Sequence, residues 1–298
     1  MALLDRWHAS RTRPLPLKFH IAHLIPDPKL HGLQGYKEVI ESLTWGLEQL
    51  GHQVTFAVNK TSKTARNIIF GGQVMSVGEQ KQLRPDSIFY NFEQLRGAGV
   101  SDVRLEIKHY AANFQVWDYS EFNLPTWTFL GTKYPVKHVP VGFAPLLERI
   151  PKPASQPIDV LIYGMTNQPR LGIFHALCQK GLSCVFLCGV YGADRDELIA
   201  RSKTIVNIGL YPDANIFEVV RVSYLMANRK AVVAYVDRNT AIEKDLVGGF
   251  QASLSDSLIA DVAAIVGDEP RRRELEARGY EKIVRRDMRE ILARALSS

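Results

Sequence analysis

Residues 203–237, KTIVNIGLYPDANIFEVVRVSYLMANRKAVVAYVD, decide the fold that the sequence predicts. Runs of β-branched residues at 204–208 and 231–236 are typical of buried parallel strands. The segment between them, 215–227, is apolar on nearly all sides and predicts a helix that is largely buried. Strand, loop, helix and strand in this order form a βαβ unit, which indicates a doubly wound α/β sheet.

Two charged residues, Glu218 and Arg221, interrupt this apolar helix. They are three positions apart, so they share one face close to the helix N-terminus, just after the loop 209–214. In an open α/β sheet, ligands bind outside the carboxyl ends of strands, where such loops and helix N-termini lie. The pair therefore predicts a ligand site, and a purely structural ion pair explains it equally well.

The composition indicates a globular protein of two domains. The chain has 298 residues, 46% of them hydrophobic, with no run of 18 apolar residues and no hydrophobic signal segment at its start. Its three cysteines, Cys178, Cys184 and Cys188, lack the spacing of a zinc or redox site. Because so sparse and odd a number fits a reducing compartment, we expect a cytoplasmic protein.

A mild excess of positive charge favours phosphate-bearing partners. The formal net charge is +6 and the pI is near 9.2. The arginines at 271–273 and 285–286 alternate with glutamates, which is typical of solvated helix faces, and a peripheral contact with anionic membrane lipid is the alternative. The sequence has no cluster of basic residues interleaved with aromatic ones, so we expect no nucleic-acid partner.

The first half of the chain alternates strands and helices. A strand at 18–25, a loop, a helix at 36–50 and a strand at 53–59 form its opening βαβ unit, and the loop lacks the spaced glycines of a dinucleotide site. Further elements are predicted as strands at 87–92, 115–119, 126–130 and 137–141, with a helix around 103–112.

The clearest linker in the sequence carries Pro151, Pro153 and Pro157. We therefore predict an N-terminal Rossmann-like domain at 1–148, a linker at 149–157 and a C-terminal Rossmann-like domain at 158–298, facing each other across a cleft. The elements expected in the second domain are strands at 159–163 and 184–188, helices ending near 180 and at 194–201, and C-terminal helices at 256–266 and 270–296. We expect the last helix to pack back toward the first domain.

This arrangement resembles a GT-B glycosyltransferase. The motifs that carry the resemblance to the group-1 type C-terminal domain are DVLIYG at 159–164, LIARSKTIVNIGLY at 198–211, NIFEVVRVSYLMANRKAVVAY at 215–235 and ARGYEKIV at 277–284. In the first half, GYKEVIESLTWGLEQLGHQV at 35–54 is similar to the acceptor domain of such enzymes. The resemblance implies an α/β fold of two Rossmann-like domains that binds a nucleotide sugar between them.

The donor signature of the family is altered in this chain. Its commonest form has two glutamates eight positions apart, whereas Leu210 and Met226 stand eight positions before and after Glu218. The small residue usual after that helix is replaced by Asn228 and Arg229. No Asp-x-Asp motif is present, so the sequence implies neither a catalytic metal nor another cofactor.

The transfer of a sugar from a nucleotide requires that the leaving diphosphate be stabilised. Cationic side chains and helix N-termini do this without a metal. The predicted donor-binding residues are Gly164, Thr166, Asn167 and Arg170 for the diphosphate, Tyr191 and Gly192 for the base, and Glu218, with Arg221 as its partner, for ribose or sugar hydroxyls. Tyr211 and Asn215 complete the predicted donor-binding set. Arg170 as an exposed helix-start arginine and Tyr191 as a packing residue are the alternatives.

The reaction also needs a group that takes the proton of the acceptor hydroxyl. The loop after the first strand should face the cleft, where His31 is the leading candidate, beside Asp27 and Glu38. Asp118 and Glu121 compete with it, because the end of their predicted strand could also reach the cleft.

The function predicted is that of a metal-independent glycosyltransferase, a hexosyltransferase, acting on a glycan, a lipid-linked sugar or a small molecule. The alternative is a non-catalytic GT-B-like subunit that binds a nucleotide sugar or a glycan, which explains the altered donor signature equally well.

Overall fold

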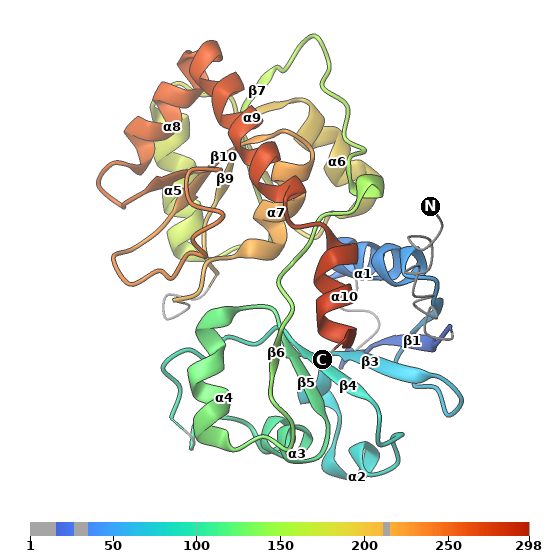
Figure 1. The fold of residues 1–298 in the computed structure, drawn as a ribbon. Helices are drawn as coiled ribbons and strands as arrows, with labels where there is room; N and C mark the ends of the chain where they lie inside the picture. The colour runs from blue at the N-terminus through green and yellow to red at the C-terminus, as the bar shows by residue number, and fades with distance from the viewer. Residues whose placement is uncertain (1–15, 27–34, 100, 211–214, 298) are drawn as a thin grey trace, which may run out of the picture.

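The computed structural model describes residues 16–26, 35–99, 101–210 and 215–297. They form two parallel sheets, each flanked by helices, with the chain crossing from one to the other along an extended linker (Figure 1). The first sheet has six strands in the order β2-β1-β3-β4-β5-β6, and the second has five in the order β11-β10-β9-β7-β8. The predicted α/β fold of two Rossmann-like sheets is thereby confirmed.

The first sheet is built from residues 18–138. Its strands are β1 (Lys18–His23), β2 (Gln53–Val58), β3 (Arg66–Phe70), β4 (Ile88–Asn91), β5 (Gln115–Asp118) and β6 (Lys137–His138). The helices are α1 (Lys37–Gln49), α2 (Val77–Gln80), α3 (Leu105–Asn113) and α4 (Leu124–Leu130), with short 3₁₀ turns η2 (Gly72–Val74), η3 (Glu121–Asn123) and η4 (Pro145–Leu147).

The second sheet begins after the linker. Its strands are β7 (Ile158–Tyr163), β8 (Cys184–Leu187), β9 (Ser202–Asn207), β10 (Ala231–Tyr235) and β11 (Gln251–Ser253). The helices are α5 (Gln168–Gln179), α6 (Gly192–Ala200), α7 (Val219–Ala227), α8 (Leu258–Gly267), α9 (Glu269–Val284) and α10 (Met288–Ser297). None of the helices in the described ranges combines the length and the apolarity that a membrane span requires.

Three secondary-structure predictions were wrong or incomplete. The strand predicted at 126–130 is helix α4, because Pro125 in the first turn favours a helix start and Trp127 packs into the core beneath it. Strands β3 and β11 were missed. The helix predicted from Asn215 begins at Val219, because the residues before it form backbone hydrogen bonds with Ala241 instead of a helical turn. The amide of Phe217 donates to the carbonyl of Ala241 (3.0 Å), and the amide of Ala241 donates to the carbonyl of Asn215 (2.7 Å). Glu218 therefore occupies the N-cap position of α7.

The last helix packs back on the first half of the chain, as expected. In Figure 1, α10 lies beside α1. A side chain at Gly46 of α1 would meet Leu292 of α10, since a β-carbon built there lies 2.8 Å from Cδ1 of Leu292. Gly46 therefore allows the close approach of these two helices.

Two of the five clustered C-terminal arginines are buried, which corrects the expectation of solvated faces. Arg272 donates from Nη1 to the carbonyls of Ile265 (3.1 Å) and Val266 (2.9 Å), where it ties α9 to α8. Arg286 forms ion pairs with Glu243 and Asp245. A contact with anionic lipid stays a prediction for the remaining exposed arginines.

Each sheet has one point at which its strand order reverses. In the first sheet, β1 lies between β2 and β3, and in the second, β7 lies between β8 and β9. Ligands of open α/β sheets bind in the crevice outside the carboxyl ends of the strands at such a point. The fold thus defines two edges at which a site is expected, one beside β1 and β3 and one beside β7 and β9.

Candidate active site

Two guanidinium groups converge on Gly164, directly after β7. The backbone of Gly164 has φ +127°, and its amide donates to the carbonyl of Leu187 at 2.9 Å. A β-carbon built on Gly164 would lie 3.0 Å from Nη1 of Arg170 and 3.0 Å from Nη2 of Arg221. Both the backbone conformation and the space therefore require glycine here.

Arg170 is not the exposed arginine that the alternative reading expected. It is 1% exposed and lies in the first turn of α5. Its Nε donates to the carbonyl of Ile208 at 3.0 Å, and its Nη1 donates to the carbonyl of Met165 at 2.7 Å. Arg170 thus ties the ends of β7 and β9 together. Burial and the neighbouring Arg221 both lower its pKa, while Glu218 opposes this shift.

Asn167 fixes the same turn from the other side. Its Oδ1 accepts from the amide of Arg170 at 2.9 Å, which caps α5, and its Nδ2 donates to the carbonyl of Leu210 at 2.7 Å. Pro169 in the first turn further favours a helix start at this point. The cap therefore joins the turn after β7 to the turn after β9.

Arg221 and Glu218 form the ion pair that their spacing predicted. Nη1 of Arg221 lies 3.1 Å from Oε2 of Glu218 and donates to Oδ1 of Asn207 at 2.9 Å, while its guanidinium stands 5.0 Å from the ring centre of Tyr163. Oε1 of Glu218 accepts from the amide of Leu210 at 3.3 Å.

The charges at this edge of the second sheet do not balance. Oε1 of Glu218 lies 3.7 Å from Nη2 of Arg170, so one carboxylate serves two arginines. Arg221 keeps 20% of its side chain exposed and Glu218 keeps 27%. The arrangement leaves an excess of positive charge that solvent, or a ligand, can reach.

The other predicted donor residues lie at varying distance from this centre. Tyr191 precedes α6 and is half-buried, and Gly192 opens that helix with φ +64°, on the same carboxyl edge as Gly164. Thr166 is exposed in the turn after β7. The carbonyl of Asn215 accepts from Nη1 of Arg96 at 2.9 Å, so its backbone makes a contact with the first half of the chain. Tyr211 lies outside the described residues.

Asp118 is an interior residue, which contradicts its predicted role as a base that faces the cleft. It is 0% exposed and accepts hydrogen bonds from Nδ2 of Asn91 (2.7 Å), Nε1 of Trp127 (2.7 Å) and the amide of Ser120 (2.8 Å). Burial raises its pKa to about 6, although these hydrogen bonds oppose the shift. Since its oxygens are occupied by internal donors, Asp118 anchors the segment after β5.

The remaining candidate bases have separate outcomes. Glu38 is buried and lies 2.7 Å from Nη2 of Arg195 in an ion pair between the two halves, so it is not available to a substrate. Glu121 is exposed at the start of η3, and its role stays a prediction. Asp27 and His31 lie outside the described residues.

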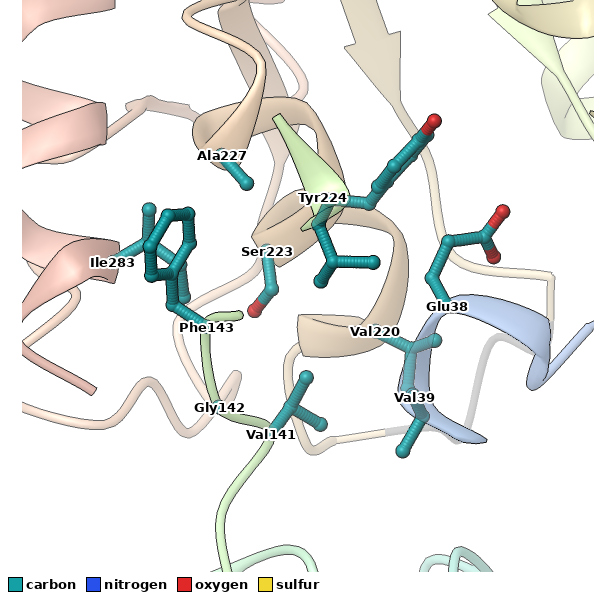
Figure 2. A pocket seen from close by; sticks show the side chains of 11 residues that line it. Glu38, Val39, Val141, Gly142, Phe143, Val220, Ser223, Tyr224, Ala227 and Ile283 are labelled. Carbon is teal, nitrogen blue, oxygen red and sulfur yellow. The ribbon is translucent and has the colours of Figure 1, made fainter. Parts of the chain in front are cut away.

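A small hollow between the two halves does not fit a nucleotide sugar. Figure 2 shows its lining from α1, from the segment before the linker and from α7, with Val39, Val141 and Val220 facing one another. Its enclosed space is about the size of one water molecule, far smaller than a typical ligand pocket. The buried hydroxyl of Ser223 has no hydrogen-bond partner among the described residues.

The two carboxyl edges meet at the seam between the sheets. Nε2 of Gln94, three residues after β4, donates to the carbonyl of Ile216 at 3.0 Å, and Oε1 of Gln94 accepts from the amide of Ile216 at 3.0 Å. Sequence reasoning missed Gln94 and Arg96, for which the only local signal was a position just after a strand. Within the part of the chain that the structure describes, no three His, Cys, Asp or Glu side chains gather in a way that would hold a metal ion.

Two Rossmann-like sheets whose carboxyl edges meet across one seam define the GT-B class of fold, and this chain has that fold. No family model and no curated protein sequence matches the chain. Among solved structures, Anabaena Alr3699/HepE in complex with UDP and glucose superposes with a TM-score of 0.65 at 13% identity, over 94% of this chain and 99% of that one.

Two further glycosyltransferases are similar in fold. AviGT4, which is involved in avilamycin A biosynthesis, has a TM-score of 0.60 at 14% identity, over 94% of this chain and 96% of its own. WaaG, which is involved in lipopolysaccharide biosynthesis, has a TM-score of 0.56 at 12% identity, over 94% and 98%. At such identities the likeness establishes the fold alone, so the function must be argued from the site.

Proposed function

We propose that this protein is a glycosyltransferase that moves a sugar, a hexose, from a nucleotide-sugar donor to a hydroxyl group of an acceptor. The observation that carries the proposal is the convergence of Arg170 and Arg221 on Gly164 at the switch point of the second sheet. Solved structures of the same fold support it, since Alr3699/HepE is described with UDP-glucose bound. The acceptor is a glycan, a lipid-linked sugar or a small molecule.

The two arginines suit a diphosphate, which gains negative charge as it leaves the sugar. Guanidinium groups bind phosphate oxygens through paired, charge-assisted hydrogen bonds, and positive charge that is in place before the reaction stabilises the leaving group. Arg221 is the arginine of the two that a ligand can reach. Arg170 is buried and held by the carbonyls of Ile208 and Met165, so it contributes its positive charge from behind Arg221 and not through direct contact. We propose that these side chains supply the charge that a divalent metal provides elsewhere, so the reaction needs no metal.

Glu218 suits the hydroxyl groups of the donor. A carboxylate accepts strong hydrogen bonds from sugar or ribose hydroxyls, and the ion pair with Arg221 holds the Glu218 side chain in place. With 27% of its side chain exposed, Glu218 can exchange its contact with the Leu210 amide for one with a ligand. In this proposal the Glu218 carboxylate forms the ion pair with Arg221 and also accepts hydrogen bonds from the donor.

The competing proposal is a non-catalytic subunit that binds a nucleotide sugar or a glycan, which explains the altered donor signature equally well. Incubation with UDP-, GDP- and ADP-sugars distinguishes the two. A transferase releases the nucleoside diphosphate with water or with an added sugar as acceptor, whereas a binding subunit only retains the nucleotide.

A pair of matched variants tests the diphosphate site. Arg221→Met keeps the apolar stem and removes the charge, and we expect it to weaken UDP binding by tenfold or more in calorimetry. Arg273→Met is the control, because Arg273 is an exposed arginine of α9 that forms an ion pair with Glu269 of the same helix. Equal UDP affinity in the two variants would contradict the proposed diphosphate site.

A further inference from the structure

Glu93 stands at the switch-point edge of the first sheet, two residues after β4. Its Oε1 accepts a hydrogen bond from Nε2 of Gln73 at 2.6 Å. Gln73 belongs to η2, which directly follows β3, the strand between β1 and β4. The Glu93 carboxylate therefore lies over the carboxyl ends of β3 and β4, and β3 borders the reversal point at which a ligand of this sheet is expected.

The same segment is fixed against the candidate donor site. Gln94, the next residue, makes its two hydrogen bonds with the backbone of Ile216, and Ile216 is two positions before Glu218. Arg96 adds a bond from Nη1 to the carbonyl of Asn215 at 2.9 Å. Glu93 is thereby placed on the acceptor side of the seam, opposite the residues proposed to hold the donor.

An internal network holds the backbone of Glu93. Its carbonyl accepts from Nδ2 of Asn91 and from Nδ2 of Asn123, each at 2.9 Å. Both asparagines also donate to the buried Asp118. Asp118 therefore has a use that its sequence position did not reveal, because it positions the segment that presents Glu93.

The surroundings of Glu93 suit proton transfer. The residue before it, Phe92, packs against two aromatic rings, with ring-centre distances of 4.9 Å to Tyr36 and 5.2 Å to Tyr119. Burial raises the pKa of Glu93, and Arg104 opposes that shift. The other titratable groups that feel its charge are the phenols of Tyr36, Tyr110 and Tyr119. A half-buried carboxylate of this kind takes protons more readily than an exposed one.

We propose that Glu93 binds the acceptor hydroxyl in the crevice between the two sheets and takes its proton during transfer, an inference that rests on the proposed glycosyltransferase function. The acceptor oxygen forms a bond to the anomeric carbon of the donor sugar as its O–H proton passes to the Glu93 carboxylate. The bond from the anomeric carbon to the diphosphate oxygen breaks, and its electron pair leaves on the nucleoside diphosphate. Arg170 and Arg221 meet that charge, and Glu93 later returns the proton to solvent.

The test uses Glu93→Gln, which keeps the shape and removes the base, with Glu48→Gln of α1 as an exposed control. UDP binding is measured by calorimetry, and UDP release from a panel of UDP-hexoses is measured with water and with glucose as acceptors. We expect Glu93→Gln to bind UDP as the wild type does and to lose about 100-fold to 10,000-fold in turnover, the usual contribution of a general base. The control keeps both properties.

The outcomes separate this inference from the function on which it rests. A wild-type protein that does not bind UDP or another nucleotide overturns the proposed function. A wild-type protein that binds UDP but releases none from any UDP-hexose also overturns it, because it then only binds the nucleotide. A Glu93→Gln variant with normal turnover overturns only the role of Glu93. A variant in which the acceptor KM rises while kcat is unchanged shows binding without proton transfer and also contradicts the proposal.

A second variant guards against a loss of folding in Glu93→Gln. Gln73→Ala removes the hydrogen bond to Glu93 and leaves the carboxylate in place. Because that bond favours the charged form, its loss should raise the pKa of Glu93 and shift the acidic limb of the pH–rate profile to higher pH. An acidic limb at the wild-type position would contradict the assignment.

Discussion

Gln94 and Ile216 are 122 positions apart in the chain and are joined by two reciprocal hydrogen bonds of 3.0 Å. The amide side chain satisfies both the N–H and the carbonyl of one residue, as a neighbouring strand would. This contact fixes the distance between the end of β4 and the turn that leads into Glu218. The two halves of the protein are therefore tied together at this seam.

Replacement of Gln94 by leucine should loosen this seam. Two hydrogen bonds at about 1 kcal/mol each are lost, and the backbone groups of Ile216 become unpaired. We expect a larger radius of gyration in X-ray scattering and lower turnover of the donor, with each domain still folded. Gln49→Leu, an exposed position in α1, is the control. Unchanged scattering together with unchanged turnover would show that the contact does not restrain the two halves.

Glu218→Gln distinguishes the two uses of that carboxylate. If Glu218 contacts donor hydroxyls, the variant should weaken donor binding by about 1–3 kcal/mol, the cost of a lost charge-assisted hydrogen bond, and keep its melting temperature. If the residue only compensates Arg170 and Arg221, the variant leaves two cations close together and loses stability. Thermal melting and titration with UDP-glucose decide between them, and unchanged affinity with a lower melting temperature would refute the ligand role.

Gly164→Ala should abolish nucleotide binding more than it disturbs the fold. The added methyl group would press on Arg170 and Arg221 at 3.0 Å, and alanine tolerates a φ of +127° poorly. We expect loss of UDP affinity by calorimetry with retained far-UV circular dichroism. Gly172→Ala serves as the control, because no atom lies within 4 Å of a β-carbon built at Gly172 in the same region. A Gly164→Ala variant that binds UDP normally would show that the two arginines do not converge on the ligand.

The buried carboxyl group of Asp118 should make the free energy of unfolding depend on pH. Burial raises its pKa to about 6, above the ordinary value of 3.8, so the folded state keeps a proton that the unfolded state has released between pH 4 and pH 6. The free energy of unfolding should therefore fall as the pH rises through this window, by at most about 3 kcal/mol at 1.36 kcal/mol per pH unit. Urea unfolding at several pH values measures the slope.

The Asp118→Asn variant provides the comparison for that slope. Asparagine has the same shape and does not titrate, so the contribution of this residue to the pH dependence should disappear. If wild type and variant show the same slope from pH 4 to pH 6, the proton is not held at Asp118.

The sequence by itself determined the fold and the centre of the candidate site. Runs of β-branched residues such as 204–208 and 231–236 are typical of buried strands, and such a run depends only on neighbouring residues. A glycine directly after a strand and a charged pair three positions apart are also local signals, which is why Gly164, Glu218 and Arg221 were identified without coordinates.

Only the tertiary structure decided what surrounds these residues. Arg170 has the appearance of an exposed residue in the sequence, and its burial follows from the return of β9 beside β7. Asp118 became an internal anchor because Asn91 and Trp127 reach it from other elements. No local signal marks Glu93 in the sequence, since its position near the seam depends on the strand order and on the contact with Ile216. Long-range packing fixes both of these, and the periodicity of the sequence does not encode them.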